Sequence, residues 1–283
     1  MTVAVTFLVL AAAMMHAIWN AFIKRAADKV AMATLIYGSG LIVAVPGIIL
    51  FPFPSLEIWQ LIFVHVFCHL IYKMALVAMY EEGDLSQVYP TTRGIAPLIT
   101  TLLAIPVIGE VPNVQQIGSI IVICLGLLIF VFEPGAFSQK RFWPLVLSGI
   151  AGVSMSIYTI ADTIAIRLPE ARFAFIGWIF LFDALTMFGL AYFRRGNRLA
   201  RLLLADWKIG ISCGIAAFLN FGIVLWALSI MQIGHVVALR ETSVVFAALI
   251  GKFFMKERFG NRRIIASIVI AGGIIVMHFA AAD

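Results

Sequence analysis

Residues 114–132 read VQQIGSIIVICLGLLIFVF, a stretch of nineteen residues without a charged side chain. A helix needs about 20 apolar residues to cross the hydrocarbon core of a bilayer, so this stretch predicts a membrane-spanning helix. Similar stretches recur along the whole chain, and we expect ten spans in all. They are residues 3–23, 31–51, 60–80, 86–107, 114–132, 142–163, 171–193, 207–230, 234–254 and 262–280.

The composition of the whole chain supports this prediction. Of the 283 residues, 63% are hydrophobic and 12% are charged, and the mean hydropathy is +1.07. Soluble domains average roughly 45–50% apolar and about 25% charged residues. Ten spans leave only short connections, so no soluble catalytic, nucleotide-binding or DNA-binding domain fits. Because hydrocarbon cannot satisfy open backbone groups, we expect an all-α integral membrane protein.

Lysine and arginine residues are divided unevenly between the two predicted sides of the membrane. One set of alternate loops holds fifteen of them, whereas the other holds only Arg167 and Arg172. Cytoplasmic loops carry the excess of positive charge, so the net charge of +6 reports orientation rather than a nucleic-acid partner. Both termini are therefore predicted outside the cytoplasm.

The two halves of the chain share spaced pairs of residues. An arginine is followed by a glutamate 17 positions later in each half, and the two pairs are 147 positions apart. The residues at this offset are Arg93 and Arg240, Glu110 and Glu257, and Gly126 and Gly273. We expect a first repeat at 1–135 and a second at 140–283. Five helices is an odd number, so the second repeat enters the membrane from the opposite side, which predicts two inverted five-helix repeats.

Four short blocks carry the polar residues of the predicted helices. They are HAIWN at 16–20 with Lys24, GDLSQVYPTTRGIAP at 83–97 with Glu110, YTIAD at 158–162, and LRETS at 239–243 with Glu257. With these blocks the chain resembles the EamA-like family of the drug/metabolite transporter superfamily, as two EamA-like repeats over nearly its whole length. The resemblance implies a ten-helix secondary carrier, commonly an exporter, with its pocket between the halves.

Two features differ from that resemblance. Many relatives have both termini in the cytoplasm, whereas the charges of this chain predict the reverse. Small multidrug resistance relatives exchange protons through a glutamate in their first helix, where this chain has His16 and no carboxylate.

Polar residues inside the predicted spans are the candidates for a binding site. An ionisable group in hydrocarbon costs roughly 2.5–3.5 kcal/mol on insertion scales, so it normally faces a partner or a wet cavity. The predicted substrate-binding residues are His16, Trp19, Asn20, His69, Tyr72, Lys73, Tyr89, Arg93, Tyr158, Asn220, Trp226 and Arg240. The predicted coupling or ion-pair residues are Asp162, Asp183 and Glu241.

His65, His69 and Lys73 are spaced four residues apart in the predicted span 60–80, which places them on one helix face. This face is either the titratable wall of a cavity or a ladder of interhelical hydrogen bonds, with Lys73 reaching toward the interface. His65 and His69 have the spacing of a zinc-binding pair, but no third ligand lies nearby in sequence. We therefore expect neither a metal nor a cofactor.

Several of the embedded charges have two interpretations. Arg93 is equally a substrate ligand or a structural cation paired with a carboxylate. Asp162 is the best candidate for a coupling carboxylate, although a fixed salt bridge with Arg93 or Arg240 is slightly favoured. Asp183 is favoured as a structural residue.

Side chains that are adjacent in sequence are expected to contact different helices. Arg240 and Glu241 point about 100° apart on a helix, so each should pair with a different helix. Trp19 either stacks on a substrate or packs in the bundle, and Asn220 and Trp226 are the expected counterparts of the first-helix residues in the second half.

These features favour a secondary active transporter of small anionic or zwitterionic metabolites, such as amino-acid-like solutes, working by alternating access as an exporter. A flippase for lipid-linked groups is the alternative. An intramembrane enzyme is less favoured, because the sequence offers neither a nucleophile with its base nor a His-Glu-x-x-His set. The expected partners are a small-molecule substrate and the lipid bilayer, with no nucleic acid and a monomeric or homodimeric state. The expected location is the bacterial inner membrane.

Overall fold

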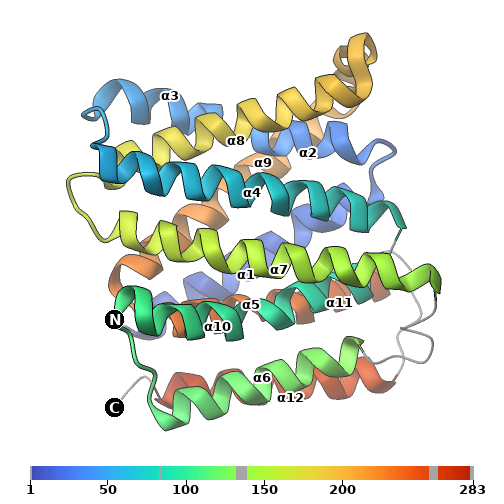
Figure 1. Ribbon diagram of the computed structural model, residues 1–283. Helices are drawn as coiled ribbons and strands as arrows, with labels where there is room; N and C mark the ends of the chain where they lie inside the picture. The colour runs from blue at the N-terminus through green and yellow to red at the C-terminus, as the bar shows by residue number, and fades with distance from the viewer. Residues whose placement is uncertain (1, 83–84, 132–138, 255–260, 281–283) are drawn as a thin grey trace.

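The computed structural model describes residues 2–82, 85–131, 139–254 and 261–280, and this part of the chain is helical without a β-strand. The helices run roughly along one common direction and form a single bundle (Figure 1). They are α1 (Thr2–Arg25), α2 (Lys29–Gly38), α3 (Leu41–Leu50), α4 (Leu56–Glu82), α5 (Leu85–Ile108), α6 (Val114–Val131), α7 (Gln139–Ile166), α8 (Arg172–Arg195), η1 (Gly196–Arg198), α9 (Leu199–Ile230), α10 (Ile233–Arg240), α11 (Ser243–Phe253) and α12 (Asn261–Ala280).

Six helical stretches of the described residues are long and apolar enough to cross a membrane. Two shorter apolar helices, Ala96–Ile108 and Val114–Ile129, lie among them. Large apolar side chains such as Phe63 and Phe193 are exposed on the outer faces of the bundle, as a lipid-facing surface requires. Each range predicted to span the membrane falls on a helix or a pair of helices, while the count of ten spans stays a prediction.

Two of the predicted spans are broken into pairs of helices. Between α2 and α3, the Ser39 hydroxyl donates to the Leu35 carbonyl at 2.7 Å, and Gly40 lies against the Phe180 ring, where a β-carbon would be 2.6 Å from that ring. A side chain that competes for backbone carbonyls and a glycine in close contact both favour a break at this point. The second break follows Glu241, whose N–H donates to Ala238 three residues back at 3.1 Å.

The packing of the helices interleaves the two halves of the chain. α4 packs along α7, and α1 packs along α9; α6 and α12 form a pair at one edge of the bundle (Figure 1). In that pair a β-carbon at Gly126 would lie 2.7 Å from the side chain of Ile270, and a β-carbon at Gly273 would lie 2.7 Å from the side chain of Ile123. Gly126 and Gly273 are 147 positions apart, and so are Ile123 and Ile270. The same offset separates the repeated sequence blocks, so the two contacts are equivalent in the two halves.

Candidate functional site

A cavity of about 60 Å³ lies inside the bundle, where helices from both halves of the chain meet. One water molecule needs roughly 10–15 Å³ of such space, so the cavity has room for a few waters or for part of a small solute. It is lined by His16, Trp19, Ile36, Tyr37, Gly40, His69, Tyr72, Tyr158, Phe180, Asp183, Gly214, Ala217, Phe218, Asn220, Phe221 and Arg240.

Several polar groups in the cavity wall lack partners within the described part of the chain, among them the side-chain oxygen of Asn220 and three hydrogen-bond donors. The indole N–H of Trp19 and the hydroxyl of Tyr37 are buried and form no hydrogen bond there. Arg240 is 6% exposed, and no hydrogen bond or ion pair joins its guanidinium to another described residue. Because buried polar groups are nearly always hydrogen-bonded in proteins, these three groups point to a polar ligand in the cavity.

A second arginine close to the cavity is fully engaged by protein groups. Arg93 from α5 is 1% exposed, its Nη2 donates to His16 Nε2, and its Nη1 lies 3.6 Å from Glu241 Oε1. The other ring nitrogen of His16, Nδ1, lies 3.3 Å from the amide nitrogen of Asn220. Arg93 thus holds helices together and does not line the cavity, whereas His16 and Asn220 do.

A chain of hydrogen bonds continues from this arginine toward one end of the bundle. The Asn20 amide donates to the His16 carbonyl at 2.8 Å and its oxygen accepts from the Tyr80 hydroxyl at 2.9 Å. Lys24 then donates to the Tyr80 carbonyl at 3.0 Å. Asn20 therefore joins α1 to α4 and does not line the cavity.

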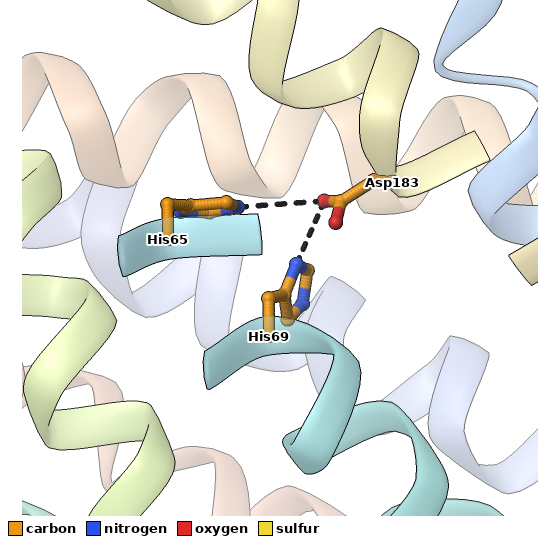
Figure 2. Close-up of side chains that lie close together, drawn as sticks. All are labelled: His65, His69 and Asp183. Atoms are coloured by element: carbon orange, nitrogen blue, oxygen red, sulfur yellow. Dashed lines mark hydrogen bonds and ion pairs between the residues drawn. The ribbon is translucent and has the colours of Figure 1, made fainter. Parts of the chain in front are cut away.

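The histidine face of α4 meets an aspartate on α8. Figure 2 shows the Asp183 carboxylate pointing between the two rings, with its Oδ2 atom 2.7 Å from His69 Nδ1 and 3.5 Å from His65 Nε2. The ligand atoms of these three buried residues all lie within 4.8 Å of one another. The fold thus supplies the third metal-type donor that is missing from the neighbouring sequence.

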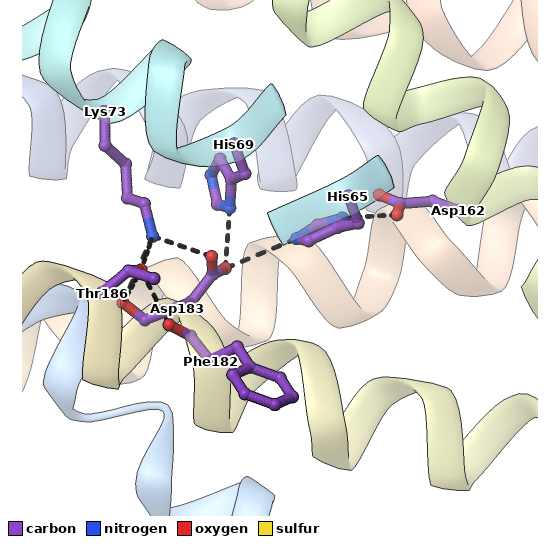
Figure 3. A network of polar contacts seen from close by, with 7 residues as sticks. All are labelled: His65, His69, Lys73, Asp162, Phe182, Asp183 and Thr186. Carbon is purple, nitrogen blue, oxygen red and sulfur yellow. Dashed lines mark hydrogen bonds and ion pairs between the residues drawn. The ribbon is translucent and has the colours of Figure 1, made fainter. Parts of the chain in front are cut away.

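Further polar groups surround this trio, as Figure 3 shows. Lys73 donates to the other carboxylate oxygen of Asp183 at 2.8 Å and to the Thr186 hydroxyl at 3.0 Å. On the far side of the network, Asp162 Oδ1 lies 2.6 Å from His65 Nδ1. These residues, which we call the His65 network (His65, His69, Lys73, Asp162, Asp183 and Thr186), tie α4 to α7 and α8.

Several sequence predictions need correction at this site. The favoured salt bridge of Asp162 with Arg93 or Arg240 is wrong for the described residues, because α7 packs along α4 and brings Asp162 to His65. Lys73 does not reach toward the membrane interface but is fully buried on Asp183. Trp226 is 44% exposed and does not line the cavity, since six helical residues turn it about 120° around α9 from Asn220.

The remaining predicted residues divide into two groups. Those that line the cavity are His16, Trp19, His69, Tyr72, Tyr158, Asp183, Asn220 and Arg240. Those held in contacts outside its wall are Asn20, Lys73, Arg93, Asp162 and Glu241. Tyr89 lies in α5, but its side chain is outside the described part of the structure, and Glu257 is outside it altogether.

Sequence analysis missed Tyr37 and the phenylalanines of the cavity wall. Tyr37 precedes the Gly38-Ser39-Gly40 break, and a run of small residues within an apolar span is the signal that could have found it. Phe180, Phe218 and Phe221 carry no such signal, because phenylalanine is equally common on lipid-facing surfaces.

Ion pairs join the connecting segments at both ends of the bundle. At one end Arg167 pairs with Glu110 at 2.6 Å and donates to the Met231 carbonyl at 3.0 Å. At the other end Arg195 pairs with Asp28 at 2.6 Å. Each pair joins the first half of the chain to the second at one end of the bundle.

Comparison with known proteins adds a family and a fold. The model of the EamA-like transporter family matches the chain twice, at residues 4–132 and 142–279. No curated protein matches the sequence. A solved crystal structure of a protein superposes with a TM-score of 0.70 at 15% identity, covering 99% of this chain and 97% of the other. At that identity the likeness concerns the fold alone.

Proposed function

Because the chain belongs to the EamA-like transporter family and is an integral multi-pass membrane protein, we propose that it is a secondary active exporter of small anionic or zwitterionic metabolites. The observation that carries the proposal is the Arg240 guanidinium, buried in the cavity wall without a hydrogen bond or ion pair to another described residue. A buried unpaired cation is costly, and an anionic group of the solute would compensate it. A carboxylate fits best, since guanidinium binds it in a bidentate geometry.

The other groups of the wall support a small polar solute. Trp19 and Tyr37 offer a donor and a hydroxyl, and the rings of Tyr72 and Tyr158 lie 6.0 Å apart beside them. The cavity volume of about 60 Å³ is far below the roughly 300–1,000 Å³ of pockets for drug-sized ligands. A metabolite of amino-acid size therefore fits the proposal better than a drug.

We propose alternating access because equivalent residues of the two halves form the same contacts with each other. The reciprocal contacts of Gly126 with Ile270 and of Gly273 with Ile123 support two repeats related by a two-fold axis. In transporters built from inverted repeats, rocking of one repeat against the other opens a central site to each side in turn. The proposed repeats are 1–135 and 140–283, in the bacterial inner membrane with both termini outside.

A flippase for lipid-linked groups is a second candidate, favoured by one observation. A groove of about 400 Å³ lies between α1 and α11 on the bundle surface, lined by apolar side chains such as Phe22 and Phe246 and by Arg25. An acyl chain fits such a surface. This candidate differs from the first in its dependence on lipid-linked substrates.

The test is counterflow in proteoliposomes that hold the purified chain and an unlabelled small carboxylate or amino acid. We expect saturable accumulation of the labelled solute without chemical change. Arg240→Met should abolish the uptake, Arg240→Lys should keep part of it, and the exposed Arg201→Met should serve as a matched control with full uptake. Equal uptake by wild type and Arg240→Met would contradict the assignment. Chemical modification of the solute would indicate an enzyme, and movement of lipid-linked substrates alone would indicate the flippase.

A further inference from the structure

We propose that His65, His69 and Asp183 form a binding site for a divalent transition-metal ion of the zinc class, beside the Arg240 cavity. Two imidazoles and a carboxylate are a donor set that binds zinc with a position left open for water or substrate. The two histidines are one helical turn apart on α4, and Asp183 projects between them from α8 (Figure 2). Asp183 Oδ2 lies 2.7 Å from His69 Nδ1, a hydrogen-bond distance, and 3.5 Å from His65 Nε2. A bound ion replaces the proton between His69 and Asp183 and moves the ligand atoms slightly apart.

The hydrogen bonding of His65 is independent support for this site. Its Nδ1 lies 2.6 Å from Asp162 Oδ1, so a neutral ring donates to the carboxylate there and keeps its lone pair on Nε2. Nε2 is fully buried, has no hydrogen-bond partner among the described residues, and faces Asp183. A carboxylate behind a histidine is the usual outer support of metal-binding imidazoles, because it fixes the tautomer and the ring orientation.

Lys73 contacts only one of the two carboxylate oxygens of Asp183 and leaves the other oxygen available to a metal ion. Its ammonium lies 2.8 Å from Oδ1, whereas both histidines face Oδ2 (Figure 3). The positive charge of Lys73 opposes a bound cation and so weakens binding. His69 and Asp183 also line the cavity, which gives the ion access to a further ligand from the cavity side.

The metal site does not depend on the proposed transport function, and binding is measured without solute. Zinc or cobalt ions are added to the full-length chain in lipid nanodiscs, followed by titration calorimetry and by X-ray absorption of the zinc-loaded wild type. We expect one ion per chain, with imidazole nitrogens and carboxylate oxygen at about 2.0–2.2 Å. Sulfur ligands, an all-oxygen shell or no stoichiometric binding would overturn the proposal.

Variants locate the ion within the chain. His69→Ala and Asp183→Asn should lose stoichiometric binding, and Asp162→Asn should weaken it by about 10–100-fold while all three ligands remain. Lys73→Gln should bind more tightly than wild type, an effect that misfolding cannot mimic. His235→Asn, a buried histidine outside the His65 network, is the control and should bind as wild type does. Unchanged binding in His69→Ala, or weaker binding in a folded Lys73→Gln, would overturn the assignment.

Discussion

The two arginines near the cavity have different surroundings, although they occupy equivalent positions in the repeated sequence. Arg93 shares its charge with Glu241 and donates to His16, whereas Arg240 faces the cavity. Identical residue types thus divide into a structural cation and a candidate ligand. The difference depends on the partners that neighbouring helices bring, and the sequence alone leaves both interpretations of Arg93 open.

The ion pair of Arg93 with Glu241 should be important for stability because both side chains are buried. Glu241→Gln removes the carboxylate that faces the buried Arg93 and should destabilise the chain by roughly 3–5 kcal/mol, the usual result of breaking a buried ion pair. The double variant Arg93→Met with Glu241→Met removes both charges and should lose less than the single variant. Thermal unfolding in detergent measures both, and a double variant less stable than Glu241→Gln would contradict this account.

Close helix contacts at small residues set the spacing between the elements. The glycines of the α6 and α12 pair allow backbones to approach, as small residues do in membrane helix packing. The position of these glycines is visible in the sequence as a repeated offset. The neighbours of each helix are not visible in the sequence. For that reason the sequence slightly favours an arginine partner for Asp162, whereas α4 brings His65 to it.

Glycine substitutions test the element packing with matched controls. Gly126→Ala and Gly273→Ala should each destabilise the chain by about 1–3 kcal/mol, because the added β-carbon meets an isoleucine at 2.7 Å. Gly118→Ala and Gly272→Ala lie on the same helices with nothing within 4 Å and should be tolerated. Equal midpoints of thermal unfolding for the two pairs of variants would show that the close approach of α6 and α12 at Gly126 and Gly273 is not needed for stability.

The all-helical membrane fold is predictable from composition and periodicity, but the cavity is not. The basic residues Arg194 and Arg195 lie at the opposite end of the bundle from Arg167, as an oriented membrane protein requires. Cavity residues such as Tyr37 come from helices distant in sequence. Their convergence depends on the breaks and crossings of helices, for which hydrophobic pattern gives no signal.

The distribution of lysine and arginine residues predicts the orientation of the whole chain in the membrane. A C-terminal alkaline phosphatase fusion should be active and a C-terminal green fluorescent protein fusion should be dark, because both termini are predicted outside the cytoplasm. Fusions after the 194–201 segment should give the reverse pattern. A fluorescent C-terminal fusion would invert the predicted topology and leave the fold unchanged.

In the proposed carrier mechanism, the cavity between the halves opens to each side of the membrane in turn. It is tested by labelling Ala217→Cys, in a chain whose three native cysteines are replaced, with a membrane-impermeant thiol reagent applied from either side. We expect labelling from both sides, with Glu110→Gln raising it from the Arg167 side because the ion pair that joins the two halves at that end is lost. Labelling from one side only, unaffected by Glu110→Gln or by solute, would contradict the carrier mechanism.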